Sequence, residues 1–153
     1  MNSNTLTLLK KLEHFKTSCH EAGLKATHQR LEIFIELASA YDHPSAETLY
    51  KRLRKSMPTL SLDTVYRTLT TFEKHNLISR VQTTESYARF EAEMEQHHHA
   101  ICSQCNKITD FQWDICETGE LPKQIAKWGQ IRNKQITLIG ICGECVQAQK
   151  TSS

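Results

Sequence analysis

The chain has 153 residues, 39% of them hydrophobic, with six cysteines and a formal net charge of only +2. That length can bury one moderate core or two small ones. No run of 18 apolar residues occurs, and Lys10 and Lys11 interrupt the first 20 residues, so a membrane-spanning helix is excluded and a signal peptide is disfavoured. We therefore expect a cytoplasmic protein in a reducing compartment, where paired cysteines bind metal more often than they form disulfides.

The charges are distributed unevenly along the chain. Residues 1–80 contain 12 Lys and Arg against 8 Asp and Glu, whereas residues 81–153 contain 7 against 9. A mildly basic first half joined to an acidic second half is typical of a DNA-facing module attached to a module with a different task. Many proteins have this much asymmetry by chance, so the pattern alone only permits a nucleic-acid partner.

Four amphipathic helices are predicted in the first half of the chain. The first covers residues around Leu6–Cys19 and ends near Gly23. Each of the next three follows a residue whose hydroxyl can cap a helix N-terminus. These caps are Thr27, Ser45 and Ser61. The third and fourth helices are expected to end at Pro58 and at Asn76.

The spacing of apolar residues gives the second and fourth helices distinct faces. The second helix is expected over Gln29–Ser39. Its buried face is expected to contain Leu31, Phe34, Ile35 and Ala38. The fourth helix is expected to bury Val65 and Leu69 and to present Tyr66 and Arg67 on a polar outer face.

After Leu77 the apolar period changes from helical to alternating. Two short strands, Leu77–Thr83 and Tyr87–Glu91, flank a polar turn and predict a β-hairpin. Helices followed by a hairpin form a winged helix-turn-helix, and a small helical bundle is the alternative. The rest of the chain is predicted to form strands around a helix near Ile115–Trp128, and these strands are His99–Cys102, Lys107–Phe111 and Gln135–Cys142. The predicted fold class is α+β.

Two C-x-x-C pairs, 36 residues apart, are formed by Cys102, Cys105, Cys142 and Cys145. Each pair can direct two thiolates to one point about 2.3 Å from a zinc ion, and two pairs complete a closed tetrahedron. Because four sulfur ligands leave no open position, such a zinc would be structural. The alternative is two independent redox or disulfide pairs. Cys19 and Cys116 lie outside this pattern and are interpreted as packed thiols.

Three consecutive histidines precede the first cysteine pair. Alternate residues of a strand point the same way, so His97 and His99 should converge while His98 points to the opposite side. Glu91 lies on the preceding strand and Asp110 on the strand that follows the cysteine pair. Imidazole and carboxylate ligands together suit Fe(II), Mn(II) or Zn(II) better than thiophilic ions. A solvated histidine tract is the alternative.

The chain closely resembles the ferric-uptake-regulator family from about residue 20 to residue 145, with the motifs in the family's order. The motifs that carry the resemblance are residues 23–30, 43–46, 61–69, 97–111 and 142–145. The resemblance implies a winged-helix DNA-binding domain over residues 1–86 and a small α/β metal-binding dimerisation domain over residues 87–153. It implies a homodimer that binds double-stranded DNA at an A·T-rich inverted-repeat operator. The function implied is repression of iron-uptake or peroxide-stress genes, without enzymatic activity.

The resemblance also implies the residues of each site. It places one structural zinc per chain on Cys102, Cys105, Cys142 and Cys145. It places a regulatory Fe(II) or Mn(II) on His43, Glu91, His97, His99 and Asp110. Because His43 comes from the first domain, this metal would act as corepressor by closing the hinge between the domains. The DNA contacts implied are those of Lys25, Thr64, Tyr66 and Arg67.

Some family members have an auxiliary metal site, whose positions fall here on Gln96, His98, Glu117 and Lys134. A lysine stands where a ligand is needed, so we expect no metal there and expect His98 to be a surface residue. The branch within the family stays open. Glu91 is typical of iron regulators, whereas Asp110 and the altered auxiliary site resemble peroxide sensors, in which a ligand histidine, here His43 or His97, is oxidised. The zinc-uptake branch is disfavoured because no cysteine occupies a sensing position.

Two other functional classes compete with a regulator. A metalloenzyme would need an open metal position and a substrate pocket, but five protein ligands leave little room. The chain also has no nucleophile motif and no glycine-rich phosphate loop. A zinc-dependent interaction module without DNA binding would leave the exposed pair Tyr66 and Arg67 unexplained.

Overall fold

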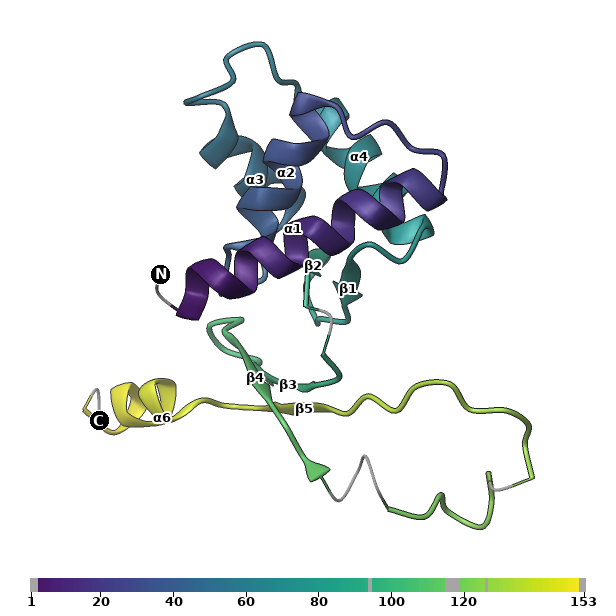
Figure 1. Ribbon diagram of the computed structural model, residues 1–153. Coiled ribbons are helices and arrows are strands. Elements are labelled where there is room, and N and C mark those ends of the chain that lie inside the picture. The colour runs from purple at the N-terminus through teal and green to yellow at the C-terminus, as the bar shows by residue number, and fades with distance from the viewer. Residues whose placement is uncertain (1–2, 94, 115–118, 126, 152–153) are drawn as a thin grey trace. The chain divides into compact units, whose positions relative to one another are not determined.

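The computed structural model describes residues 3–93, 95–114, 119–125 and 127–151 (Figure 1). The chain divides into two compact units, Met1–Met94 and Glu95–Ser153. The boundary expected after residue 86 falls inside the hairpin of the first unit, which continues to Met94 because its second hairpin strand pairs with the first. Among the described residues, no helix is both long and apolar enough to cross a membrane.

The described part of the first unit contains four helices. They are α1 (Ser3–Glu21), α2 (His28–Ala38), α3 (Ala46–Leu53) and α4 (Leu62–Lys74). The three predicted caps are confirmed, because each hydroxyl oxygen accepts a hydrogen bond from the backbone N–H three residues later. Gly23 and Asn76, with φ of 67° and 55°, follow α1 and α4 as predicted. Helix α3 ends before Pro58, because the N–H groups of residues 56 and 57 turn back to the carbonyl of Leu53.

Three aromatic rings form the centre of the first unit's core. Phe15 stacks on Phe34 with 4.0 Å between ring centroids, and it meets Phe72 edge-on at 5.0 Å. All three side chains are buried, and burying each one stabilises the fold by roughly 1.5–3 kcal/mol. Because these rings come from α1, α2 and α4, their contacts fix the position of α4 against the helices before it.

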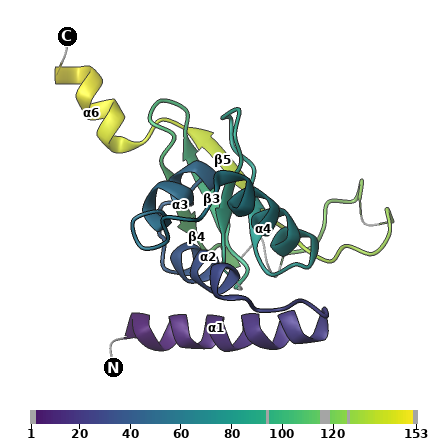
Figure 2. The same cartoon turned by 90° about the horizontal axis from the view of Figure 1, so that it is seen from above.

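The buried face of α2 differs from the predicted one. Ile33, Phe34 and Leu37 are buried. The other residues of the predicted face are only half-buried, namely Leu31, Ile35 and Ala38. Helix α1 runs beside α2 in both views (Figure 2), and Phe15 covers Phe34 from that side. The predicted face is therefore confirmed at Phe34, and Leu31 and Ala38 pack against the core, whereas the buried residues Ile33 and Leu37 were not predicted.

A two-stranded antiparallel hairpin completes the first unit. It pairs β1 (Ser79–Val81) with β2 (Arg89–Glu91) and places Glu91 opposite Ser79. The helices and this hairpin form a winged helix-turn-helix, so the predicted hairpin is confirmed and the helical bundle is wrong. The backbone N–H of Phe90 donates to the carbonyl of Pro44 at 3.1 Å, which ties the hairpin to the loop before α3.

The second unit is built on a three-stranded sheet with the order β4-β3-β5 among its described residues. The strands are β3 (His98–Cys102), β4 (Ile108–Phe111) and β5 (Thr137–Gly140). Strand β4 is antiparallel and β5 parallel to the central strand β3. Helix α6 (Gly143–Thr151) follows β5 and was not predicted.

The helix predicted near Ile115–Trp128 falls partly outside the described residues, which omit 115–118 and 126. Where the structure describes this stretch, residues 119–125 are not helical. The N–H of Ile125 donates to the carbonyl of Pro122 in a turn. Pro122 offers no N–H to a helix ladder and disfavours helical conformation in the residue before it.

Candidate metal centres and DNA-binding surface

Four cysteine side chains of the second unit converge on one point. Cys102 ends β3, Cys105 lies in the turn after it, and Cys142 and Cys145 lie at the start of α6. The Sγ atoms of Cys102 and Cys145 are 3.9 Å apart, and those of Cys105 and Cys142 are 3.8 Å apart. Within the turn, Asn106 has a φ of 59° and donates its N–H to the carbonyl of Cys102, which bends the chain so that both thiols of the pair face the same way.

These sulfur distances fit a zinc ion and do not fit disulfides. Four sulfurs placed tetrahedrally about 2.3 Å from zinc lie about 3.8 Å from one another, whereas a disulfide requires about 2.05 Å. The backbone N–H of Cys142 donates to the Cys102 sulfur at 3.3 Å. This hydrogen bond is the main reason that the pKa of Cys102 falls to about 6. A thiolate at that position is the ionised form that zinc binds.

A second group in the same unit contains His97, His99 and Asp110. The β3–β4 register places Asp110 directly opposite His99, and their Oδ1 and Nε2 atoms are 3.5 Å apart. The Nε2 atoms of the two histidines approach to 3.0 Å, so these side chains converge as predicted. The Nδ1–H of His97 donates to the carbonyl of Glu95 at 2.8 Å, which leaves the Nε2 lone pair directed into the group.

The remaining two residues of the predicted regulatory set lie together in the first unit. His43 Nε2 is 3.2 Å from Glu91 Oε2, and both residues are buried, with 4% and 7% of their surfaces exposed. His43 has a φ of 49°, in the left-handed region that costs a non-glycine residue roughly 1–2 kcal/mol. A buried carboxylate beside a buried imidazole in a strained loop is an arrangement suited to a cation.

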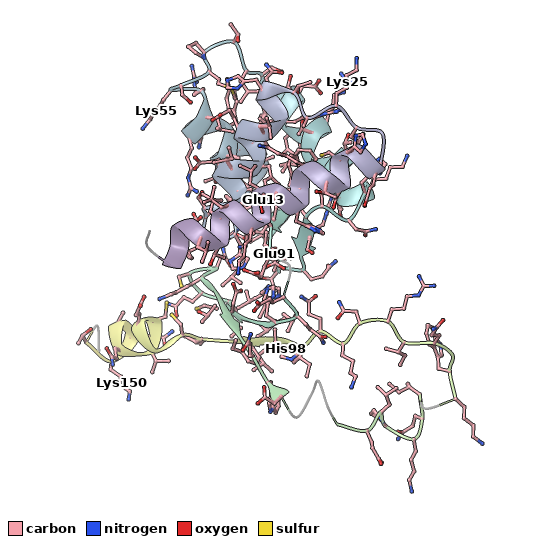
Figure 3. All side chains as sticks on the ribbon, viewed as in Figure 1. Glu13, Lys25, Lys55, Glu91, His98 and Lys150 are labelled. Atoms are coloured by element: carbon pink, nitrogen blue, oxygen red, sulfur yellow. The ribbon has the colours of Figure 1, made fainter. Side chains whose placement is uncertain are left out.

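His98 is fully buried, so the prediction that it is a surface residue is wrong (Figure 3). It lies on the central strand of its sheet, and its ring is 5.5 Å from that of Phe111. Its Nδ1 accepts the backbone N–H of Ile136 at 3.2 Å, so the proton of the neutral ring is on Nε2 and that nitrogen has no lone pair for a metal. Nε2 has no hydrogen-bond partner among the described residues.

The described side chains at the other auxiliary-site positions also make hydrogen bonds within the unit. The Gln96 side chain donates to the carbonyl of Lys134 at 2.7 Å, and the Lys134 ammonium donates to the carbonyl of Gly119 at 3.2 Å. Glu117 lies outside the described residues. The described residues at these positions therefore make hydrogen bonds within the unit, and their chemistry does not fit a metal ion.

The residues predicted to contact DNA lie on one side of the first unit. A hollow of about 580 Å³ separates the loop after α1 from α4, and Lys25, Thr64 and Arg67 line it. Lys25 extends outward from its loop (Figure 3), and the Arg30 guanidinium donates to the Lys25 carbonyl at 2.8 Å. The side chains around this hollow thus combine three cations, Lys25, Arg30 and Arg67, with one face of α4.

Tyr66 does not line this hollow; it lies on α4 and is 41% exposed. Its hydroxyl donates to the carboxylate of Glu47, in the first turn of α3. That hydrogen bond raises the pKa of Tyr66 and lowers the pKa of Glu47. The phenol therefore stays neutral and has a preferred direction, which sequence reasoning did not anticipate.

A winged helix on a chain with two groups of metal-binding side chains defines a metal-responsive transcriptional regulator. Residues 21–139 match the model of the Ferric uptake regulator family. The peroxide-responsive repressor PerR of Staphylococcus aureus (strain Mu50) is 31% identical over 136 residues, which cover 88% of this chain and 91% of that protein. The chain belongs to the ferric uptake regulator family.

Solved structures agree with this assignment. The Helicobacter pylori ferric uptake regulator, described as having three functional metal binding sites, matches with a TM-score of 0.75 and 31% identity. The match covers 92% of this chain and 94% of that one. The manganese-containing regulator from Pseudomonas aeruginosa has a TM-score of 0.70 and 30% identity, with 84% and 97% of the two chains covered.

Family membership decides between the functional classes. Members of this family are transcriptional regulators, so the protein is a metal-responsive DNA-binding repressor and not an enzyme. The metalloenzyme and the zinc-dependent interaction module are therefore not retained. The four cysteines and the His, Glu and Asp side chains described above are groups of this chain that could hold metal ions.

Replacing one cysteine of the group tests the zinc geometry. We expect Cys102→Ser to lose the one zinc ion per chain and to unfold the second unit, because three sulfurs cannot complete the tetrahedron. Inductively coupled plasma mass spectrometry and thermal melting measure the two effects. The control Cys19→Ala removes a buried thiol outside the group and should keep its zinc. Full zinc occupancy in Cys102→Ser would contradict the assignment.

The buried ring of His98 provides a second test. We expect His98→Ala to reduce the free energy of unfolding of the second unit by about 1–3 kcal/mol, because the Ile136 N–H loses its acceptor. The number of Mn(II) ions bound per chain should not change. Urea unfolding and metal titration measure the two quantities, with His28→Ala, whose side chain is 78% exposed, as the control. A bound ion lost at unchanged stability would identify His98 as a ligand instead.

Proposed function

We propose that the protein is a homodimeric repressor in which one Fe(II) or Mn(II) binds residues from both units. The proposed ligands are His43, Glu91, His97, His99 and Asp110. The observation that supports this is that each unit already holds its share of these side chains close together, with imidazole next to carboxylate, and that the four side chains other than Asp110 are buried. A set of nitrogen and oxygen donors suits these ions.

The proposed mechanism is a linkage between metal binding and domain arrangement. Ligands divided between two units can bind the same ion only when the hinge between the units is closed. The closed state is then favoured by the difference in metal affinity between the two states. By reciprocity, operator DNA that binds the closed state should tighten metal binding.

We assign the structural zinc to Cys102, Cys105, Cys142 and Cys145. These ligands all belong to the second unit, and they would join the turn after β3 to the start of α6. A unit with a three-stranded sheet has a small core, so a metal crosslink supplies stability that its packing does not. This zinc would be needed whether or not the regulatory metal is present.

The homodimer is expected to form through β5. That strand lies at the edge of the described sheet, and Leu138, Ile139 and Ile141 at its end are 47%, 62% and 48% exposed. An exposed apolar edge strand is a place where another chain can pair, and a second copy would pair with it symmetrically.

DNA reading is proposed for α4 and the loop before α2. Tyr66 would contact a thymine methyl group, Arg67 a guanine edge or a phosphate, Thr64 the backbone, and Lys25 the minor groove. In a dimer the two copies of α4 would occupy successive major grooves roughly 34 Å apart, as an A·T-rich inverted repeat requires. We assign this task to the first unit and dimerisation to the second, with ligands of the regulatory metal in both, in the cytoplasm where the chromosome is accessible.

A gel-shift experiment tests the proposed function. We expect the wild-type protein to retard an A·T-rich inverted-repeat duplex at moderate salt when Mn(II) is present, and not when it is absent. His97→Ala should abolish this effect of the metal and still sediment as a dimer, because His97 is a ligand outside the dimer contact. No retardation of the operator by the wild-type protein with Mn(II) would contradict the function, and a monomeric His97→Ala would make the site structural.

Tyr66→Ala is the matched variant in the same experiment. It should bind Mn(II) as the wild type does, because no metal ligand is removed. Its affinity for the operator should fall more than its affinity for unrelated DNA, because the substitution removes a base contact. The control Tyr41→Ala changes a residue that is 79% exposed and lies outside α4. Equal losses of specific and non-specific binding would identify Tyr66 as a backbone contact.

We propose that oxidation by peroxide distinguishes the two branches that Glu91 and Asp110 leave open. An iron or manganese regulator loaded with Fe(II) and treated with peroxide should gain no oxygen atom on His43 or His97. Mass spectrometry of proteolytic fragments measures this. A stoichiometric gain of one oxygen on either histidine would instead make the protein a peroxide sensor.

A further inference from the structure

The loop that carries His43 is held by a side chain from the hairpin. The Arg89 guanidinium, on β2, donates through Nη2 to the carbonyl of Asp42 at 2.6 Å and through Nε to the carbonyl of His43. The next residue of β2, Phe90, donates its backbone N–H to the carbonyl of Pro44 at 3.1 Å. Three consecutive carbonyls of this loop are therefore bound by two consecutive residues of one strand.

These hydrogen bonds from Arg89 and Phe90, here called the clamp, hold a loop residue whose backbone conformation is strained. His43 has a φ of 49°, which a residue with a Cβ adopts only when its surroundings enforce it. The position before Pro44 restricts the backbone further. The strand that supplies the clamp also ends in Glu91, whose Oε2 lies 3.2 Å from His43 Nε2. The direction of the imidazole toward this carboxylate thus depends on the carbonyls that Arg89 holds.

The guanidinium is itself fixed by the turn of the hairpin. Its Nη1 donates to Glu85 Oε2 at 2.8 Å, and the two side chains are only 14% and 6% exposed. Glu85 also accepts the hydroxyl of Tyr87. A planar group with several donors in fixed directions can make these contacts at the same time, and a lysine ammonium cannot reproduce the geometry.

We propose that Arg89 is a positioning residue for the regulatory metal, which orients His43 through the loop carbonyls without binding the ion. The proposal rests on the proposed role of His43 as a ligand. It also gives the hairpin a part in metal binding, because the same guanidinium contacts the hairpin turn and the ligand loop. Supporting groups of this kind commonly change metal affinity by about 10- to 100-fold.

The direction in which the Kd for Mn(II) changes distinguishes a positioning role of Arg89 from an effect of its charge. A guanidinium near a cation site weakens metal binding by Coulomb repulsion, so removing its charge would by itself tighten binding. Loss of the orientation of His43 would instead weaken metal binding. Arg89→Gln removes both the charge and the fixed fork, whereas Arg89→Lys keeps the charge and loses the fork.

The test is the Kd for Mn(II), measured by isothermal titration on full-length, zinc-loaded protein. We expect Arg89→Gln to raise the Kd by about tenfold or more. Arg89→Lys should raise it at least as much, because this variant loses the fork and keeps the charge that repels the metal. The control is Arg80→Gln on β1, the other strand of the hairpin, where Arg80 makes a two-point contact with Glu73 at 3.0 and 2.8 Å. That variant loses a similar ion pair away from the ligand loop, and its Kd should equal that of the wild type.

His43→Ala, included in the same titration, separates the two possible failures. If His43→Ala binds Mn(II) as the wild type does, the proposed function fails. A different result overturns only the positioning role of Arg89. In that result His43→Ala loses Mn(II) binding, but Arg89→Gln binds Mn(II) as tightly as the wild type or more tightly. Hydrogen exchange of the Phe90 amide in the metal-free protein should quicken in Arg89→Gln, and not in Arg80→Gln. If Arg89→Gln does not fold, Arg89→Lys decides, and a wild-type Kd overturns the proposal.

Discussion

A buried histidine next to a buried carboxylate is the contact on which the proposed regulatory chemistry depends. In the first unit this contact joins His43 to Glu91. Removing a charged group from water costs several kcal/mol unless a partner compensates it. Such a pair is stable in the absence of metal, yet each member is also a good ligand. A cation can therefore take over contacts that already exist, and its binding does not require the unit to refold.

The two metal groups differ in how their ligands are divided along the chain. Four cysteines of one unit form a closed set, and the sulfur spacings of 3.8 and 3.9 Å match one tetrahedron. The proposed regulatory ligands are divided instead between residues before and after the boundary at Met94 and Glu95. A metal bound within one unit can only stabilise that unit. One that needs both units can report on their arrangement, which makes it suitable as a signal.

Sequence patterns predicted most of the features that depend only on residues close together in the chain. The caps at Thr27, Ser45 and Ser61 are each formed within one turn of helix, so three residues contain the information. The buried face of α2 was predicted only in part, because a helix's own periodicity does not show which neighbouring elements cover it. His43 had no local signal, because a histidine before proline in a loop becomes a candidate ligand only beside Glu91, 48 residues later. The resemblance to a known family supplied that pairing.

Neighbouring histidines differ in role because their Nδ1 atoms have different partners. In His97 the Nδ1–H donates to a carbonyl, so the lone pair of Nε2 is available to an ion. In His98 the Nδ1 accepts a backbone N–H, so Nε2 is protonated and the ring serves the sheet. Strand alternation alone separated His97 from His98, but it did not show which nitrogen of each ring carries the proton. Each tautomer follows from a backbone partner, the carbonyl of Glu95 for His97 and the N–H of Ile136 for His98, so the local backbone determines which of the two neighbouring histidines offers Nε2 to a metal.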